Sequence, residues 1–217
     1  MTSSSLEVVG LLACVLGVSA CTEASVSMSG GAREYVASDY TVVLSRWTRT
    51  EQLITLSELD DELTATATFE SWDFRWAYVV KYAADYRLTV EQRRELLQRT
   101  LADTQVRYEF YVALYGTKYK WDDLTKPNAA WIVRLIDEKG NETAPVHINL
   151  VKPGPIEYQY FPYTSPHRHC FRIDFPRISS DGKPTIANDA KWFGLRFAGA
   201  QGNEELRWSV VEEPKKT

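Results

Sequence analysis

Apolar and polar positions alternate with a period of two over several stretches of this chain of 217 residues. The alternation is strictest in LTATATF, residues 63–69, where threonines separate the apolar residues. This pattern predicts a strand with one buried face. Residues 106–114 alternate in the same way and predict another strand. The stretch YTVVLSRW, residues 40–47, is predicted to form the first strand of the fold.

The period changes to that of a helix between these strands. Apolar residues recur at helical spacing over 72–86 behind Ser71, a favourable N-cap residue, so this stretch is predicted to be a helix. A second helix is predicted over 89–104, because Thr89 and Gln92 fit a capping box. Its residues expected to face inward are Val90, Leu97 and Leu101.

Strand patterns return after the helices and continue to the end of the chain. The strands at 131–135 and 146–150 flank the turn sequence DEKGN and are predicted to pair as a hairpin. The pattern as a whole predicts a mainly β fold, an antiparallel β-sandwich, Ig-like in general architecture, with a two-helix insertion at about 71–105. The predicted later strands are 131–135, 146–150, 156–160, 170–176, 192–197 and 206–210.

The composition is that of a folded domain, and its net charge does not attract a negatively charged partner. Hydrophobic residues make up 44% of the chain and aromatic residues 12%, which excludes general disorder. The formal net charge is −4, so charge recruits neither nucleic acid nor an anionic membrane surface. We therefore expect no nucleic-acid partner.

A separate apolar run near the N-terminus extends from Val8 to Ala20 without a charged residue. A helix needs about twenty residues to cross a bilayer, whereas about seven to fifteen suit the apolar core of a secretory signal. The run ends with the small residues Ser19 and Ala20, directly before Cys21. The run therefore predicts a cleaved signal peptide, with a buried helix or an uncleaved anchor as the alternative.

The sequence VSAC, which ends at Cys21, resembles the lipobox of bacterial lipoproteins. The resemblance implies that residues 1–20 form the signal peptide and that Cys21 receives a diacylglyceryl group on its sulfur. LLAC, which ends at Cys14, is a second candidate for the same motif. Inner-membrane lipoproteins commonly carry Asp after the acylated Cys, so Thr22 implies the outer membrane if the organism has one.

The remaining chain divides into a tether and one domain. Residues 21–38 are rich in Ser, Gly and Ala without a period and are predicted to be a flexible tether. Residues 39–217 are predicted to be a single β-sandwich domain with the helical insertion. If Cys14 is removed and Cys21 acylated, Cys170 has no partner in the chain, so the fold is expected to stand without disulfides.

One stretch, HRHC at 167–170, combines residue types that bind metals. On a strand, His167 and His169 share one face and could reach one metal ion. The site still needs one or two further ligands, and His147 is the third histidine of the chain. A metal-dependent hydrolase centred on His167 and His169 is therefore one alternative function; no cofactor is otherwise expected.

Aromatic residues gather in EYQYFPY, residues 157–163. On a strand the rings point to both faces, so at least one ring should be exposed unless the predicted helices cover it. Exposed rings on a sandwich stack on sugars or peptides, and the alternative is that these rings close the core. A carbohydrate-binding module is thus a second alternative function. Its candidate ligand-binding residues are Tyr158, Tyr160, Phe161 and Tyr163.

The sequence contains no nucleophile elbow, no zinc-binding helix motif and no glycine-rich phosphate loop. The leading hypothesis is therefore a non-enzymatic, lipid-anchored protein of the cell envelope. It is expected to reach the membrane through its N-terminal lipid. Its expected role is to bind another envelope component, a protein or a glycan, or to support an assembly.

Overall fold

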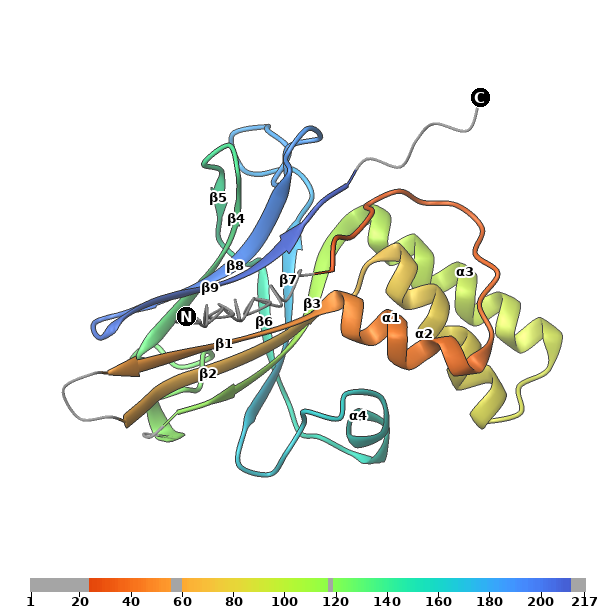
Figure 1. Cartoon of the computed structure of the whole chain (residues 1–217), viewed down its shortest axis with the longest axis horizontal. Coiled ribbons are helices and arrows are strands. Elements are labelled where there is room, and N and C mark those ends of the chain that lie inside the picture. The colour runs from red at the N-terminus through yellow and green to blue at the C-terminus, as the bar shows by residue number, and fades with distance from the viewer. Residues whose placement is uncertain (1–23, 56–59, 117–118, 212–217) are drawn as a thin grey trace, which may run out of the picture.

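Two packed antiparallel sheets and a group of helices at one end make up the computed structural model, which describes residues 24–55, 60–116 and 119–211 (Figure 1). This confirms the predicted mainly β sandwich with a helical insertion. The five-stranded sheet has the order β1 (Thr48–Thr55), β2 (Asp60–Phe69), β3 (Arg107–Tyr115), β7 (His169–Pro176) and β6 (His147–Val151). The four-stranded sheet has the order β5 (Glu142–Thr143), β4 (Trp131–Asp137), β8 (Trp192–Gly199) and β9 (Gly202–Ser209). The helices are α1 (Tyr40–Trp47), α2 (Trp72–Asp85), α3 (Val90–Val106) and α4 (Pro155–Tyr160).

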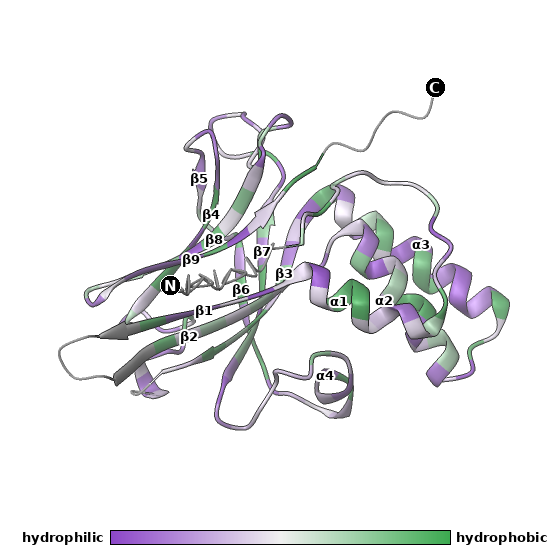
Figure 2. Cartoon of the chain, in the orientation of Figure 1, coloured by the Kyte–Doolittle hydropathy of each residue, from purple (hydrophilic) through white to green (hydrophobic). Residues whose placement is uncertain are grey.

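The core lies between the two sheets and is largely aromatic. Phe69 of β2 stacks on Phe110 of β3 with ring centroids 4.8 Å apart. Phe193 of β8 stacks on Trp208 of β9 at 5.4 Å. Figure 2 shows hydrophobic positions on strands of both sheets. The inward residues of β7 and β8 alternate as predicted and are fully buried: Phe171, Ile173, Phe175, Phe193, Leu195 and Phe197.

Residues 40–47 form helix α1, so the prediction of a first strand here is wrong. The apolar residues of the stretch stand at helical spacing, and the tertiary structure buries that set. Tyr40 packs against Phe74 of α2 with ring centroids 6.0 Å apart. At the other end of α1, Trp47 packs edge-on against Phe69, with ring centroids 5.6 Å apart. The buried residues of α1 are Tyr40, Val43, Leu44 and Trp47.

The predicted hairpin between 131–135 and 146–150 is also wrong. β4 instead pairs with β8 and with the two-residue strand β5. The carboxylate of Asp137 accepts hydrogen bonds from the backbone N–H groups of Lys139 and Asn141, both at 3.0 Å, and closes this short hairpin. The chain then crosses to the other sheet, where Ile148 of β6 lies opposite Ile173 of β7.

Residues 155–160 form helix α4, where a strand was predicted. Pro155 occupies the first helical position, which its fixed backbone angle favours. The Glu157 carboxylate accepts a hydrogen bond from the backbone N–H of Gly154 at 2.9 Å, which satisfies a donor at the start of the helix. The proline and the hydrogen bond at the start of the segment therefore favour a helix, although the aromatic residues alternate with the period of a strand.

The two insertion helices begin where the sequence predicts. Ser71 caps α2 by accepting a hydrogen bond from the N–H of Phe74 at 3.1 Å. Thr89 and Gln92 form the predicted capping box at the start of α3. Of the residues predicted to face inward on α3, Leu101 is buried, whereas Val90 is 73% exposed. The prediction for Val90 is wrong because the first turn of α3 extends beyond the surface that buries Leu101.

The segment before α1 packs on the domain, so the predicted flexible tether over 21–38 is wrong for residues 24–38. Val26 is buried and forms a parallel bridge with Val210 after β9, donating its N–H to Ser209 at 2.8 Å. Arg33 donates to Asp73 of α2 at 3.0 Å. These partners are far away in sequence, which is why the local composition does not reveal them.

The predicted signal peptide and both candidate lipid-bearing residues, Cys14 and Cys21, lie outside the described residues. Within the described part of the chain, none of the helices has the length and apolar character required to span a bilayer.

Candidate functional site

Charged side chains lie on the face of the five-stranded sheet that points away from the sandwich core. In β3, Tyr108 and Phe110 face the core, so Glu109 and Tyr111 point to the opposite face. Arg172 of β7 lies opposite Tyr111 in the antiparallel register. The sequence of the two strands therefore places acidic, basic and aromatic groups side by side, beneath the insertion helices.

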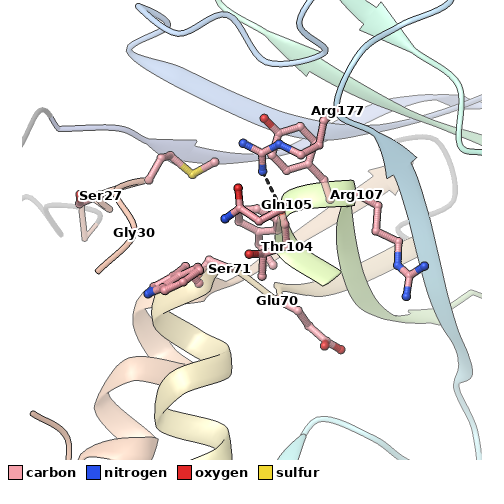
Figure 3. Close-up of a pocket in the computed structure, with 12 residues that line it drawn as sticks. Ser27, Gly30, Glu70, Ser71, Thr104, Gln105, Arg107 and Arg177 are labelled. Atoms are coloured by element: carbon pink, nitrogen blue, oxygen red, sulfur yellow. Dashed lines mark hydrogen bonds between the residues drawn. The ribbon is translucent and has the colours of Figure 1, made fainter. Parts of the chain in front are cut away.

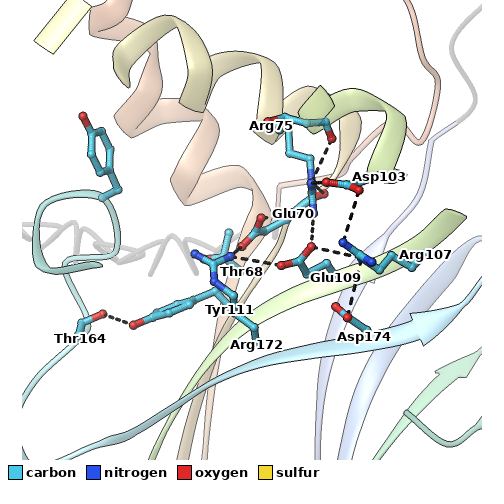
Figure 4. A network of polar contacts seen from close by, with 12 residues as sticks. Thr68, Glu70, Arg75, Asp103, Arg107, Glu109, Tyr111, Thr164, Arg172 and Asp174 are labelled. Carbon is cyan, nitrogen blue, oxygen red and sulfur yellow. Dashed lines mark hydrogen bonds and ion pairs between the residues drawn. The ribbon is translucent and has the colours of Figure 1, made fainter. Parts of the chain in front are cut away.

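Two arginines and two glutamates form the centre of an ion-pair cluster on this face (Figure 4). Arg75 of α2 donates to the Glu109 carboxylate at 2.5 Å and lies 3.4 Å from the Glu70 carboxylate. Arg172 donates to Glu70, and to Glu109 at 3.3 Å. Each guanidinium thus contacts both carboxylates. The four residues come from α2, β3, β7 and the end of β2, so the cluster joins the helices to the sheet.

Burial and ion pairing shift the pKa values of the Glu70 and Glu109 carboxyl groups in opposite directions. Burial raises the pKa of Glu70, and the neighbouring Glu109 charge raises it further against the lowering effect of Arg172 and Arg75. Burial also acts to raise the pKa of Glu109, but Arg75 and Arg172 outweigh it and hold that pKa below its usual value. The pair therefore consists of one carboxyl that ionises readily and one that resists ionisation.

Both arginines are held in place by further contacts. The Arg75 guanidinium donates to the carbonyl oxygens of Glu70 at 2.9 Å and Thr100 at 3.1 Å. The Arg172 guanidinium lies over the Tyr111 ring, 5.6 Å from its centroid, and 6.0 Å from that of Phe161. Phe161 stacks on Tyr111 at 4.1 Å. The cluster is therefore pre-organised by main-chain acceptors on one side and by aromatic rings on the other.

A cavity of about 240 Å³ lies against this cluster, between the helices and the sheet. Three aromatic rings and six charged side chains contribute to its wall. A smaller cavity of about 60 Å³ beside Ser71 and Thr104 shares Glu70 and Arg107 with it (Figure 3). The residues lining the larger cavity are Glu70, Phe74, Arg75, Tyr78, Thr100, Asp103, Arg107, Glu109, Phe161 and Arg172.

No family of known proteins matches this chain, and no curated protein matches it either. Three guanidinium groups face three carboxylates in the cavity wall, so the wall is balanced in charge. Such a wall combines donors, acceptors and flat apolar surface, as small-molecule sites do.

The two histidines predicted as weak metal candidates do not share a strand face. His167 precedes β7 and is exposed, whereas His169 is the first residue of β7 and is only 8% exposed. His169 stacks on Tyr119, with ring centroids 3.8 Å apart. Within the described residues, no group of three or more histidine, cysteine, aspartate or glutamate side chains could hold a metal ion. The predicted arrangement of His167 and His169 is therefore wrong.

The aromatic segment is mostly covered. Tyr158 is 44% exposed, whereas Tyr160 and Phe161 are 1% exposed, so the expectation of an exposed aromatic stack is wrong for these two residues. Tyr160 packs edge-on against Tyr78 of α2 at 5.0 Å, and Tyr163 is half-buried. Phe161 nevertheless lines the cavity. One residue of the predicted segment therefore belongs to the site, but from inside the fold.

The charged residues of the site were not predicted from the sequence. The signal was visible in β3 and β7, where Glu109 and Arg172 alternate with apolar residues. Polar residues at such positions are typical of a solvent-exposed face. Only the helices that cover this face turn these residues into a buried ionic cluster.

Proposed function

We propose that the protein is a non-enzymatic, lipid-anchored component of the bacterial cell envelope that binds a glycan of the envelope. The cavity next to the Glu70 and Glu109 pair supports the binding role. The lipobox-like sequence at Cys21 supports the anchor, and Thr22 supports placement at the outer membrane if the organism has one. The carbohydrate hypothesis thus moves from exposed rings at 158–163 to a cavity that contains Phe161.

The balanced charge of the cavity wall favours a polar ligand without a net charge. Carboxylates accept hydrogen bonds and guanidinium groups donate them, so together they match the hydroxyl groups of a sugar. The rings of Phe74, Tyr78 and Phe161 supply flat apolar surface for the C–H face of the same sugar. The volume of about 240 Å³ lies just below that of typical ligand pockets, about 300–1,000 Å³. We therefore expect one terminal sugar unit of a longer chain to enter.

Filling the cavity tests this function. Thr100 is one of the residues that line the cavity, and its main-chain carbonyl holds Arg75, so Thr100→Phe adds bulk at the cavity and leaves the carbonyl in place. We expect Thr100→Phe to weaken binding of soluble envelope oligosaccharides at least about tenfold, measured by calorimetry. The matched control is Gln98→Phe, at an exposed position of the same helix.

Two outcomes would contradict the glycan proposal. The first is that no oligosaccharide fragment of the host envelope binds the unmodified domain at millimolar concentration. The second is that Thr100→Phe and Gln98→Phe bind equally well while both unfold at the temperature of the parent protein. Thermal unfolding of each variant separates loss of the site from loss of the fold.

The anchor is tested separately by intact mass. Protein extracted from membranes of its host is expected to begin at Cys21 and to carry acyl groups, and Cys21→Ala is expected to lack them. Two or more acyl chains give stable membrane attachment, whereas one is marginal. An unmodified chain that still contains residues 1–20 would exclude the lipoprotein assignment, and acylation at Cys14 would move the anchor to the alternative motif.

A further inference from the structure

A second cavity, of about 310 Å³, lies beside the N-terminal end of β7 and the C-terminal end of β6. It shares no lining residue with the cavity next to Glu70. Its wall contains Lys152 and Arg168 together with Tyr119 and His169. Leu150 adds an apolar side chain that is half exposed. The cavity therefore combines cationic groups with a flat aromatic surface.

The aromatic part of this cavity is a stacked pair. Tyr119 begins a short 3-10 helix, Tyr119–Trp121, and its ring lies 3.8 Å from the His169 ring at an angle of 25°. His169 is 8% exposed and its Nδ1 has no hydrogen-bond partner, whereas Tyr119 is 50% exposed. Tyr119 thus rests one face on a buried imidazole and leaves ring surface open to a ligand.

The cationic part differs from the paired arginines of the first cavity. Arg168 donates to the Thr66 hydroxyl at 3.2 Å, which is a neutral acceptor. Neither Arg168 nor Lys152 has a carboxylate within ion-pair distance among the residues that the structure describes. Two positive charges therefore border the cavity without an ion-paired carboxylate among the described residues, and an anionic group would form charge-assisted hydrogen bonds there.

We infer that this cavity binds a small organic anion that carries a flat ring. The oxyanion of the ligand lies between Arg168 and Lys152, and the ring of the ligand packs on Tyr119 and Leu150. A carboxylate and a phosphate share this chemistry, because guanidinium groups bind both in a bidentate manner. The inference is independent of glycan binding, because the two cavities have different walls.

Binding to the full chain is tested with three ring compounds of similar size. We expect benzoate or phenyl phosphate, or both, to bind with a dissociation constant of about 1 mM or lower, and the neutral benzamide to bind at least about tenfold more weakly. Comparison of the two anions identifies the preferred oxyanion. Shifts of the NMR signals of Tyr119 and His169 are expected to locate the bound ring.

Two variants and a control assign the contacts. Arg168→Gln is expected to weaken anion binding at least about tenfold, because it removes the charge but keeps a hydrogen-bonding group near Thr66. Tyr119→Ala is expected to weaken binding of the ring compounds several-fold. Lys191→Gln removes an exposed charge outside the cavity and is expected to change nothing. Thr100→Phe is likewise expected to leave anion binding intact, which separates this site from the glycan site.

The inference is overturned if neither anion binds at about 10 mM, or if benzamide binds as tightly as benzoate. It is also overturned if Arg168→Gln, folded as judged by its thermal unfolding, binds as the parent does. NMR shifts confined to the Glu70 cavity would place the anion in the first site instead.

Discussion

Arg75→Met is expected to lower the free energy of unfolding by roughly 3–5 kcal/mol, the cost of removing one partner from a buried ion pair. Arg75 is 5% exposed, and its guanidinium contacts Glu70, Glu109 and Thr100. Methionine retains much of the volume but none of the donors. The variant leaves two buried carboxylates, of which Glu70 keeps Arg172 and Glu109 keeps Arg172 and Arg107 as ionic partners.

The pH dependence of this loss identifies its cause. Without Arg75, the pKa values of Glu70 and Glu109 both rise above the value of about 4.3 for an unfolded glutamate. The folded variant then binds more protons than the unfolded chain, so its stability is lost as the pH rises through these raised values. Urea unfolding is therefore expected to show a larger deficit at pH 8 than at pH 5.

Arg99→Met is the matched control, because Arg99 is exposed on α3. It is expected to change stability by less than about 0.5 kcal/mol. A deficit for Arg75→Met that is the same at both pH values would mean that lost packing, and not the uncompensated charge of the carboxylates, is the cause. An additional change of Glu109 to Gln should then recover nothing, whereas recovery is expected if repulsion between the carboxylates dominates.

Asp73→Ala is expected to lower the free energy of unfolding by roughly 2–4 kcal/mol, because it leaves several donors without an acceptor. Asp73 is 6% exposed at the start of α2. Its carboxylate accepts hydrogen bonds from the Tyr35 hydroxyl at 2.5 Å and from Trp47 and Arg33 at 3.0 Å. One side chain therefore joins the N-terminal segment, α1 and α2. Chemical denaturation at pH 7 measures the loss.

Burial acts to raise the pKa of Asp73, but the hydrogen bonds from Tyr35, Trp47 and Arg33 outweigh it and lower that pKa. A lowered pKa gives stability that is present above the unfolded value of about 3.9 and is lost as the pH falls through the folded value. The deficit of Asp73→Asn, which keeps the shape, should therefore be full at pH 7 and shrink below about pH 4. A deficit that persists unchanged at pH 3 would show that the charge of Asp73 contributes little.

The sequence alone was sufficient where the signal is local and regular. The strict alternation at 63–69 and in β7 and β8 predicted strands whose apolar side faces a core, because a period of two determines which side chains share a face. Ser71 and the pair Thr89 and Gln92 marked the starts of α2 and α3, because caps bond within one turn. The lipobox-like motif at Cys21 is also local, and it stays a prediction.

Contacts between residues that are distant in sequence were decided by the tertiary structure. A short apolar stretch such as 40–47 fits a helix or a strand, and contact with α2 decides for α1. Composition suggested a loose tether for 24–38, whereas Asp73 and Val210 hold that segment on the domain. The strands at 131–135 and 146–150 do not pair because they enter different sheets, and the sequence of the turn between them does not encode which sheet each strand enters.

In the candidate site, too, the sequence determined one part and the tertiary structure decided the rest. Alternation placed Glu109 and Arg172 on the polar face of their strands, and this much the sequence determined. The sequence does not say whether water or a helix covers that face, because burial depends on the docking of α2 over β3. That docking turned the charges into a buried pair of carboxylates held by Arg75 and Arg172, and left the cavity beside them. Charges in a strand have this chemistry only when tertiary packing removes the water around them.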